Sequence, residues 1–156
     1  MAVPEPTTVA EEWLYATLAA DAAVAAAVGD RYWPEYAPVG AAAPFLTFSL
    51  VGGEAMAPVA GAPPCLWTLL WEVTAWGEGP GRQQLRGPMQ AALAAVAGDG
   101  LAGRPAAPFG SGDGSRWVVR CAYEGPVATP PLAGEVAGEG VWARIAHAVM
   151  IELSPA

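Results

Sequence analysis

The chain has 156 residues, a formal net charge of −8 and no lysine, and only 14% of its residues are charged. Proteins hold the nucleic-acid backbone mainly with cationic side chains that displace counterions, so this balance argues against a chain that grips DNA or RNA. The hydrophobic fraction of 54% exceeds what one small core requires, and surplus apolar residues indicate a surface that a partner covers. We expect a single domain over residues 1–156.

The N-terminal part of the chain predicts a short arm followed by a helix. Residues 1–7 have neither a basic region nor an apolar stretch, so we expect a flexible arm there. Thr8 and Glu11 have the spacing of a capping box, and Gly29 is suited to end a helix. The helix predicted over Trp13–Val28 has one apolar stripe, made of Leu14, Leu18, Ala22, Ala25 and Val28.

The rest of the chain predicts strands and a second helix. Alternating apolar residues predict strands over residues 45–51, 67–76, 116–123 and 141–153, and helical spacing predicts a helix over residues 85–96. Pro88 requires that this helix either kinks or begins only a few residues earlier. Residues 31–44 and 101–115 are predicted to be irregular. Two segments rich in glycine and proline, residues 52–64 and 125–140, are predicted to be mobile loops.

Groups that could perform catalysis are few and isolated. His147 lies on the apolar side of the last predicted strand, so we interpret it as a core or interface residue rather than a base. No Gly-x-Ser-x-Gly motif accompanies it. Cys65 and Cys121 do not make a disulfide framework in a chain of this length, and we expect buried, reduced thiols in a cytoplasmic setting.

Ligand-binding loops are not expected either. The glycine-rich turn at residues 77–81 contains Pro80, which removes an N–H donor, and Glu78, which repels phosphate. Asp99 and Asp113 stand alone in glycine loops and lack the several oxygen ligands of a calcium site. No apolar run reaches the ~18–20 residues needed to cross a bilayer. We therefore predict no catalytic residues, no cofactor, no metal, no membrane contact and no enzyme activity.

The seven tryptophans divide into two groups. Four of them fit inward-facing positions and are predicted to lie in the core: Trp13, Trp67, Trp71 and Trp117. Trp33, Trp76 and Trp142 occur at loops or strand ends, where an amphipathic ring can seal either the core or an interface. With Tyr36, these three are the candidate assembly-interface residues.

From its first helix to its last strand, the chain resembles the phage tail-terminator (tail-completion) family. These proteins begin with a helix of spaced leucines, then Gly-Asp-Arg and an aromatic residue, and then a loop that leads to a Pro-Phe strand. The segments VTAWGEG and RQQLRGPMQAALAAV, and a final strand with an arginine among apolar residues, extend the similarity. The matching residues are Leu14, Leu18, Asp21, Val28, Gly29, Asp30, Arg31, Tyr32, Pro44, Phe45, Leu46, Thr47, Phe48, Arg144, Ile145, Val149 and Ile151.

This resemblance implies an α+β fold in which two helices pack on a mainly antiparallel sheet. It also implies a hexameric ring that caps the tail tube, contacts the tail tube protein and meets the head–tail connector proteins, in a virion assembled in the host cytoplasm. The acidic balance fits a lumen through which DNA passes without being held. Two other classes stay open: another head–tail joining or minor virion structural protein, and a small-molecule-binding or enzymatic α+β domain.

Overall fold

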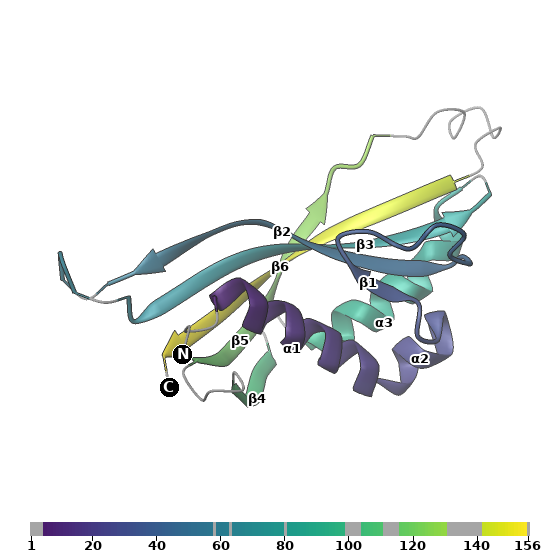
Figure 1. Cartoon of the computed structure of the whole chain (residues 1–156). Helices are drawn as coiled ribbons and strands as arrows, with labels where there is room; N and C mark the ends of the chain where they lie inside the picture. The colour runs from purple at the N-terminus through teal and green to yellow at the C-terminus, as the bar shows by residue number, and fades with distance from the viewer. Residues whose placement is uncertain are drawn as a thin grey trace.

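The computed structural model describes residues 5–57, 59–62, 64–79, 81–98, 104–110, 116–130 and 142–155. Its elements follow one another as helices, a hairpin, a helix and further strands (Figure 1). They are α1 (Pro6–Ala20), α2 (Ala22–Val28), β1 (Tyr32–Pro34), β2 (Phe45–Met56), β3 (Leu66–Glu78), the 3-10 turn η1 (Gln83–Leu85), α3 (Arg86–Ala97), β4 (Arg104–Gly110), β5 (Arg116–Val127) and β6 (Trp142–Pro155).

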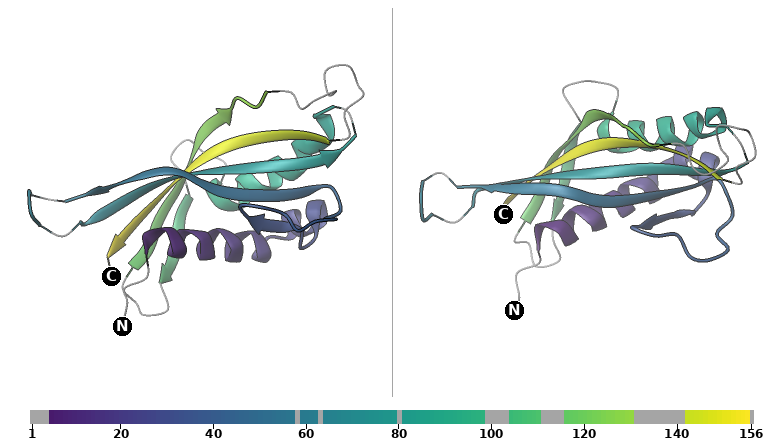
Figure 2. Two further views of the ribbon diagram at one scale, coloured as in Figure 1. Left: turned by 45° about the horizontal axis from the view of Figure 1, so that its top comes forward. Right: turned by 90° about the horizontal axis from the view of Figure 1, so that it is seen from above.

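The strands form one six-stranded sheet in the order β1-β2-β3-β6-β5-β4. Only β1 and β2 are parallel, and the other four neighbouring pairs are antiparallel. The three α-helices lie together on one face of the sheet (Figures 1 and 2). The α+β architecture with a mainly antiparallel sheet is thus confirmed, although the sheet is mixed and the expected count of two helices is wrong.

The third helix arises because the predicted first helix is interrupted at Asp21. This residue has extended backbone angles (φ −93°, ψ 122°), and its carboxylate accepts hydrogen bonds of 2.9 Å from the backbone N–H groups of Ala23 and Val24. It therefore ends α1 and caps α2. The capping box predicted at Thr8 is also wrong, because α1 begins at Pro6, whose fixed φ suits the first turn.

The core lies between the helices and one face of the sheet. Its largest fully buried side chains include Phe48 of β2, Trp71 of β3 and Ile151 of β6. Phe48 is paired with Val73, and Trp71 with Val149, so residues of one parity on each strand face the helices. In α3, Pro88 is accommodated because the helix begins at Arg86, which puts the proline in the first turn where N–H groups lack helical partners.

Three segments differ from the sequence-based prediction. Short strands β1 and β4 occur where irregular chain was expected. β2 continues to Met56, so residues 52–56 of the predicted 52–64 loop are strand. Residues 125–127 of the other predicted loop belong to β5, and residues 131–140 lie outside the described residues.

Of the predicted N-terminal arm, residues 1–4 lie outside the described residues and Pro6 already belongs to α1. Mobility of the N-terminal residues 1–7 and of the two predicted loops remains a prediction. Among the described helices, none has the length and apolar character needed to span a bilayer.

Candidate assembly surface

The face of the sheet away from the helices carries a cluster of aromatic side chains around Phe45. Because Phe45 pairs with Trp76, and Trp76 pairs with Arg144, the side chains of these three residues lie on the same face of the sheet, the one without helices. The Phe45 ring stacks on Trp76, with centroids 6.1 Å apart and an interplanar angle of 18°. Trp33 and Trp142 meet the same phenyl ring edge-on, at centroid distances of 5.8 and 5.9 Å. The structure therefore brings three of the four candidate interface residues together, and we call Trp33, Phe45, Trp76 and Trp142 the aromatic cluster.

Polar contacts fix the orientation of Trp76 within this cluster. Its indole Nε1–H donates to Thr47 Oγ1 at 3.0 Å. The guanidinium carbon of Arg144 lies 5.5 Å from the centroid of the indole ring, which is a cation–π distance. The buried Nε of Arg144 has no hydrogen-bond partner among the described residues. Because these two contacts already restrict the Trp76 ring, a partner that packs against it would lose less free energy in ordering this side chain.

The fourth candidate, Tyr36, lies beside the cluster rather than in it. It lines a hollow of about 290 Å³ together with Glu35, Ala37, Phe45, Thr47, Trp76 and Trp142. Its side chain is 83% exposed, so the chain itself provides little cover for it. Glu35 has a positive φ of 59° and donates its N–H to the carbonyl of Phe48 at 2.9 Å, which holds this loop against β2.

The burial of the tryptophans agrees only in part with the two predicted groups. Trp13 and Trp71 are buried in the core, as expected, whereas Trp67 is half-buried. Trp33, Trp76 and Trp142 are all half-buried on the opposite side of the sheet. The side chain of Trp117 lies outside what the structure describes. Sequence reasoning missed Phe45 as the centre of the cluster, because an apolar residue at the start of a strand gives no sign of which face it occupies.

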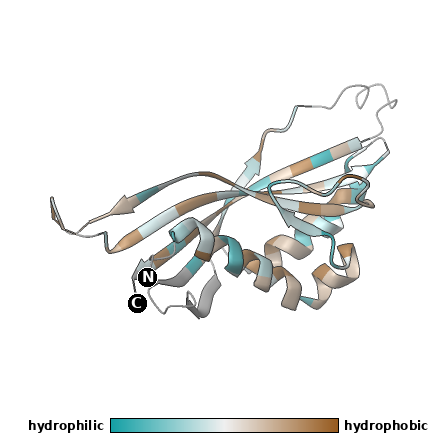
Figure 3. Ribbon diagram, viewed as in Figure 1, coloured by the Kyte–Doolittle hydropathy of each residue, from teal (hydrophilic) through white to brown (hydrophobic). Residues whose placement is uncertain are grey.

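A second apolar surface lies on the hairpin formed by the far ends of β2 and β3. In Figures 1 and 2 this hairpin extends beyond the helices as an arm. Its exposed apolar side chains are Leu50, Val51, Met56 and Val59, and Figure 3 shows the alternation of apolar and polar positions along it. β6 pairs with β3 as far as Trp67, whereas no strand among the described residues covers the outer edge of β2 in this part of the hairpin. The arm is therefore suited to contact a partner.

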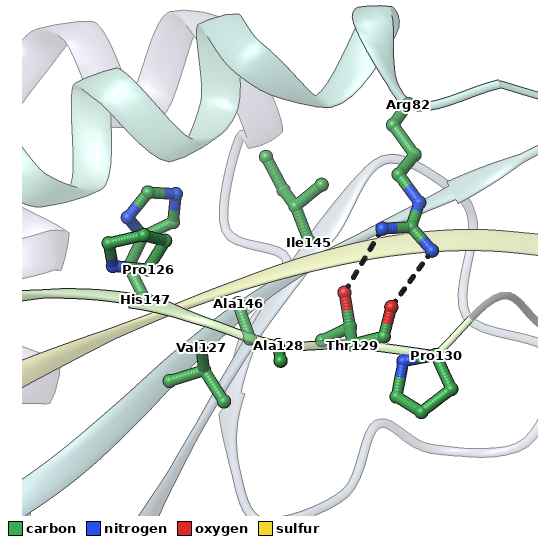
Figure 4. Close-up of a pocket in the computed structure, with 9 residues that line it drawn as sticks. All are labelled: Arg82, Pro126, Val127, Ala128, Thr129, Pro130, Ile145, Ala146 and His147. Carbon is green, nitrogen blue, oxygen red and sulfur yellow. Dashed lines mark hydrogen bonds between the residues drawn. The ribbon is translucent and has the colours of Figure 1, made fainter.

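His147 lies in a different hollow, of about 520 Å³, at the end of β5 (Figure 4). Its Nδ1 is 2.9 Å from the hydroxyl of Tyr123, and burial lowers the pKa of the imidazole from its ordinary value. Arg82 donates to the side-chain oxygen of Thr129 at 3.2 Å and to its carbonyl at 3.1 Å, closing one side of the hollow. The histidine thus has a structural partner, in agreement with its interpretation as a core or interface residue.

The two cysteines occupy different environments and are both free. Cys121 is fully buried, and burial raises the pKa of its thiol to about 12. Cys65 is exposed, so the prediction that both thiols are buried is wrong for this residue. Cys65 follows the tip of the arm, where the chain turns back into β3 and offers little cover. Among the described residues, no group of three or more His, Cys, Asp or Glu side chains is arranged to hold a metal ion.

An α+β domain with one helix-covered face and an aromatic, partly exposed opposite face has the features of an assembly subunit. The family profile of Tail completion protein gp17 matches residues 12–114, about two thirds of the chain. The chain belongs to the tail completion protein gp17 family, and it is a structural protein of the virion, located at the tail and neck.

Comparison with solved structures supports this fold over almost the whole chain. A chain from the virion of the native gene transfer agent (GTA) particle is similar, with a TM-score of 0.60 and 16% sequence identity. The match covers 90% of this chain and 91% of the other. At that identity the similarity concerns the fold. No curated protein matches the sequence.

Proposed function

We propose that the protein forms a ring, expected to be a hexamer, that caps the tail tube and forms its junction with the head connector. The observation that carries this proposal is the aromatic cluster on the helix-free face, in a chain of the tail completion family. Large, half-buried aromatic side chains with a cationic neighbour are the residues that supply most binding energy at protein interfaces. Contacts of this kind between different patches of successive copies generate closed rings.

The charge of the chain is consistent with a passage for DNA. With a net charge of −8 and no lysine, a lumen lined by this chain attracts few phosphates, and DNA passes without being retained. The tail tube protein and the connector proteins are the proposed partners at the two ends of the ring. This function requires no catalytic step from the chain.

Electron microscopy of the purified protein, alone and with tail tubes, tests the proposal. We expect rings of uniform subunit number, and we expect the same rings at one end of each tube. Mass photometry over a range of concentrations gives the subunit number independently. A protein that stays monomeric at high concentration and does not attach to tubes would contradict the proposed function. Binding of the protein to head connectors, without rings on tail tubes, would identify another head–tail joining protein instead.

A further inference from the structure

The sheet has two partly open edges, which lie on opposite sides of it. β1 pairs only with residues 46–48 of β2, so the outer edge of β2 over residues 49–56 has no partner strand among the described residues. On the far side, the described pairs of β4 with β5 run from Gly110 with Trp117 to Arg104 with Cys121. The outer edge of β5 over residues 122–127 is therefore also open within the described part of the chain.

The backbone groups on the open edge of β2 follow from the hydrogen bonds at its ends. Phe48 accepts a bond on the outer side, from the loop after β1, whereas Met56 accepts one from the chain entering β3. A bulge interrupts the alternation after Leu50. Counting from both ends, the N–H and C=O groups of Leu50, Gly53 and Ala55 point away from β3. These are strong donors and acceptors arranged for a further strand.

The side chains around this edge do not protect it. Exposed sheet edges are usually blocked by prolines, lysines or other charges, yet residues 49–56 contain no proline, lysine or arginine and only one acidic residue, Glu54. Instead they expose Leu50, Val51 and Met56, the last two with more than half of their surface accessible. An edge that is both open and apolar favours the addition of a strand from another chain.

We propose that the open edge of β2 pairs with the open edge of β5 from the next copy of this chain, so that the sheets of neighbouring subunits become continuous. This inference rests on the proposed ring and names the contact that builds it. Since β2, β3, β6 and β5 alternate in direction, β2 of one copy lies antiparallel to β5 of a copy in the same orientation. The two edges are different surfaces, so the contact is heterologous and repeats around a ring.

The covered parts of the two edges are complementary. β1 occupies one end of the β2 edge, and β4 occupies the opposite end of the β5 edge. In the proposed contact, β1 of one copy therefore lies beyond one end of the paired stretch, and β4 of the next copy lies beyond the other end. Matching the centres of the two open stretches requires a shift of roughly three residues, about 10 Å along the strands. Such a stagger between strands is normal when a sheet closes on itself.

Two variants, each with one introduced cysteine, test the pairing in the assembled protein. Val51→Cys lies on the β2 edge and Glu124→Cys on the β5 edge, and both native side chains are exposed. Each variant also carries Cys65→Ser, because Cys65 is exposed, whereas Cys121 is buried and its thiol stays protonated. The two proteins are mixed, allowed to assemble and treated with a short bis-maleimide. Ala16→Cys, on an exposed position of α1, replaces Val51→Cys in the matched control.

We expect a cross-linked heterodimer from the mixture, no cross-link from either variant alone, and none from the Ala16→Cys control. A homodimer from Val51→Cys alone would show that two β2 edges meet, which overturns the proposed pairing. Intact rings without the heterodimer would overturn it as well, while leaving the ring function in place. Absence of rings in every sample, including the parent protein, would instead refute the proposed function.

Hydrogen exchange gives a readout that does not depend on substitutions. The amides of Leu50, Gly53 and Ala55 are expected to exchange rapidly in dilute monomer and to become protected by at least tenfold in rings. The amide of Leu46, already bonded to the carbonyl of Arg31 at 2.9 Å, should change much less. Equal exchange of the three edge amides in monomers and rings would contradict the inference.

Discussion

Replacement of Trp76 by alanine should weaken assembly while leaving a folded subunit. The indole ring is half-buried, so its truncation is expected to cost about half of the ~3–5 kcal/mol that a fully buried tryptophan costs. Loss of the hydrogen bond to Thr47 adds about 1 kcal/mol. The expected fall in the free energy of unfolding is therefore about 3 kcal/mol, less than the ~5–15 kcal/mol stability of an ordinary domain.

The effect of Trp76→Ala on the ring should be larger than its effect on folding. If the aromatic cluster is an interface centre, truncation costs about 2 kcal/mol or more for each subunit contact, which weakens each contact roughly 30-fold. Urea unfolding of dilute protein measures the first quantity, and mass photometry across concentrations measures the second. Trp71→Phe is the control, because it alters a tryptophan on the helix side only. Ring formation by Trp76→Ala at the same concentration as the parent would refute this reasoning.

Three further predictions concern the stability and chemistry of the subunit. Asp21→Ala should lower the free energy of unfolding by about 1 kcal/mol, because the cap of α2 is lost. Asp21→Asn should retain most of the stability that the cap provides. Equal stability of the parent and both variants would contradict the capping role. Native protein should be alkylated at Cys65 and not at Cys121, whose thiol has a pKa of about 12, and mass spectrometry that finds both labelled before unfolding would disprove this. Burial lowers the pKa of His147 below 6.5, so its neutral form is favoured in the fold and stability should fall as the pH drops below that value. This dependence should be weaker in His147→Gln, and an unchanged pH profile in that variant would exclude the histidine as its source.

Much of the fold could be predicted from hydrophobic period, and the exceptions have local causes. Alternation predicted a strand over residues 67–76, and β3 spans Leu66–Glu78. The interruption at Asp21 was missed because the apolar stripe continues on both sides of it, while its short carboxylate competes for nearby backbone N–H groups. The end of β2 was missed because Gly52 and Gly53 have low strand propensity, although pairing with β3 holds them in the sheet.

The candidate surface could be predicted less completely than the fold. Trp33, Trp76 and Trp142 were identified from their places at loops and strand ends, yet these places carry no information on the distances between the three rings. Their convergence on Phe45 depends on the register of β2, β3 and β6. A shift of one residue in any pair would put a ring on the helix side, so the cluster exists only once the register is set.

The separation of the two sheet faces determines how substitutions in this chain act. On the helix face, Phe48 and Trp71 pack against each other at 6.3 Å between centroids and are almost fully buried, so their truncation removes core contacts and lowers the stability of the subunit. On the other face, Trp76 and Tyr36 retain accessible surface in the monomer, and a partner can still bury it. Strand alternation makes neighbouring residues such as Val73 and Thr74 of β3 belong to different faces. Adjacent positions are therefore expected to differ in kind, one controlling the folding of the subunit and the next its association.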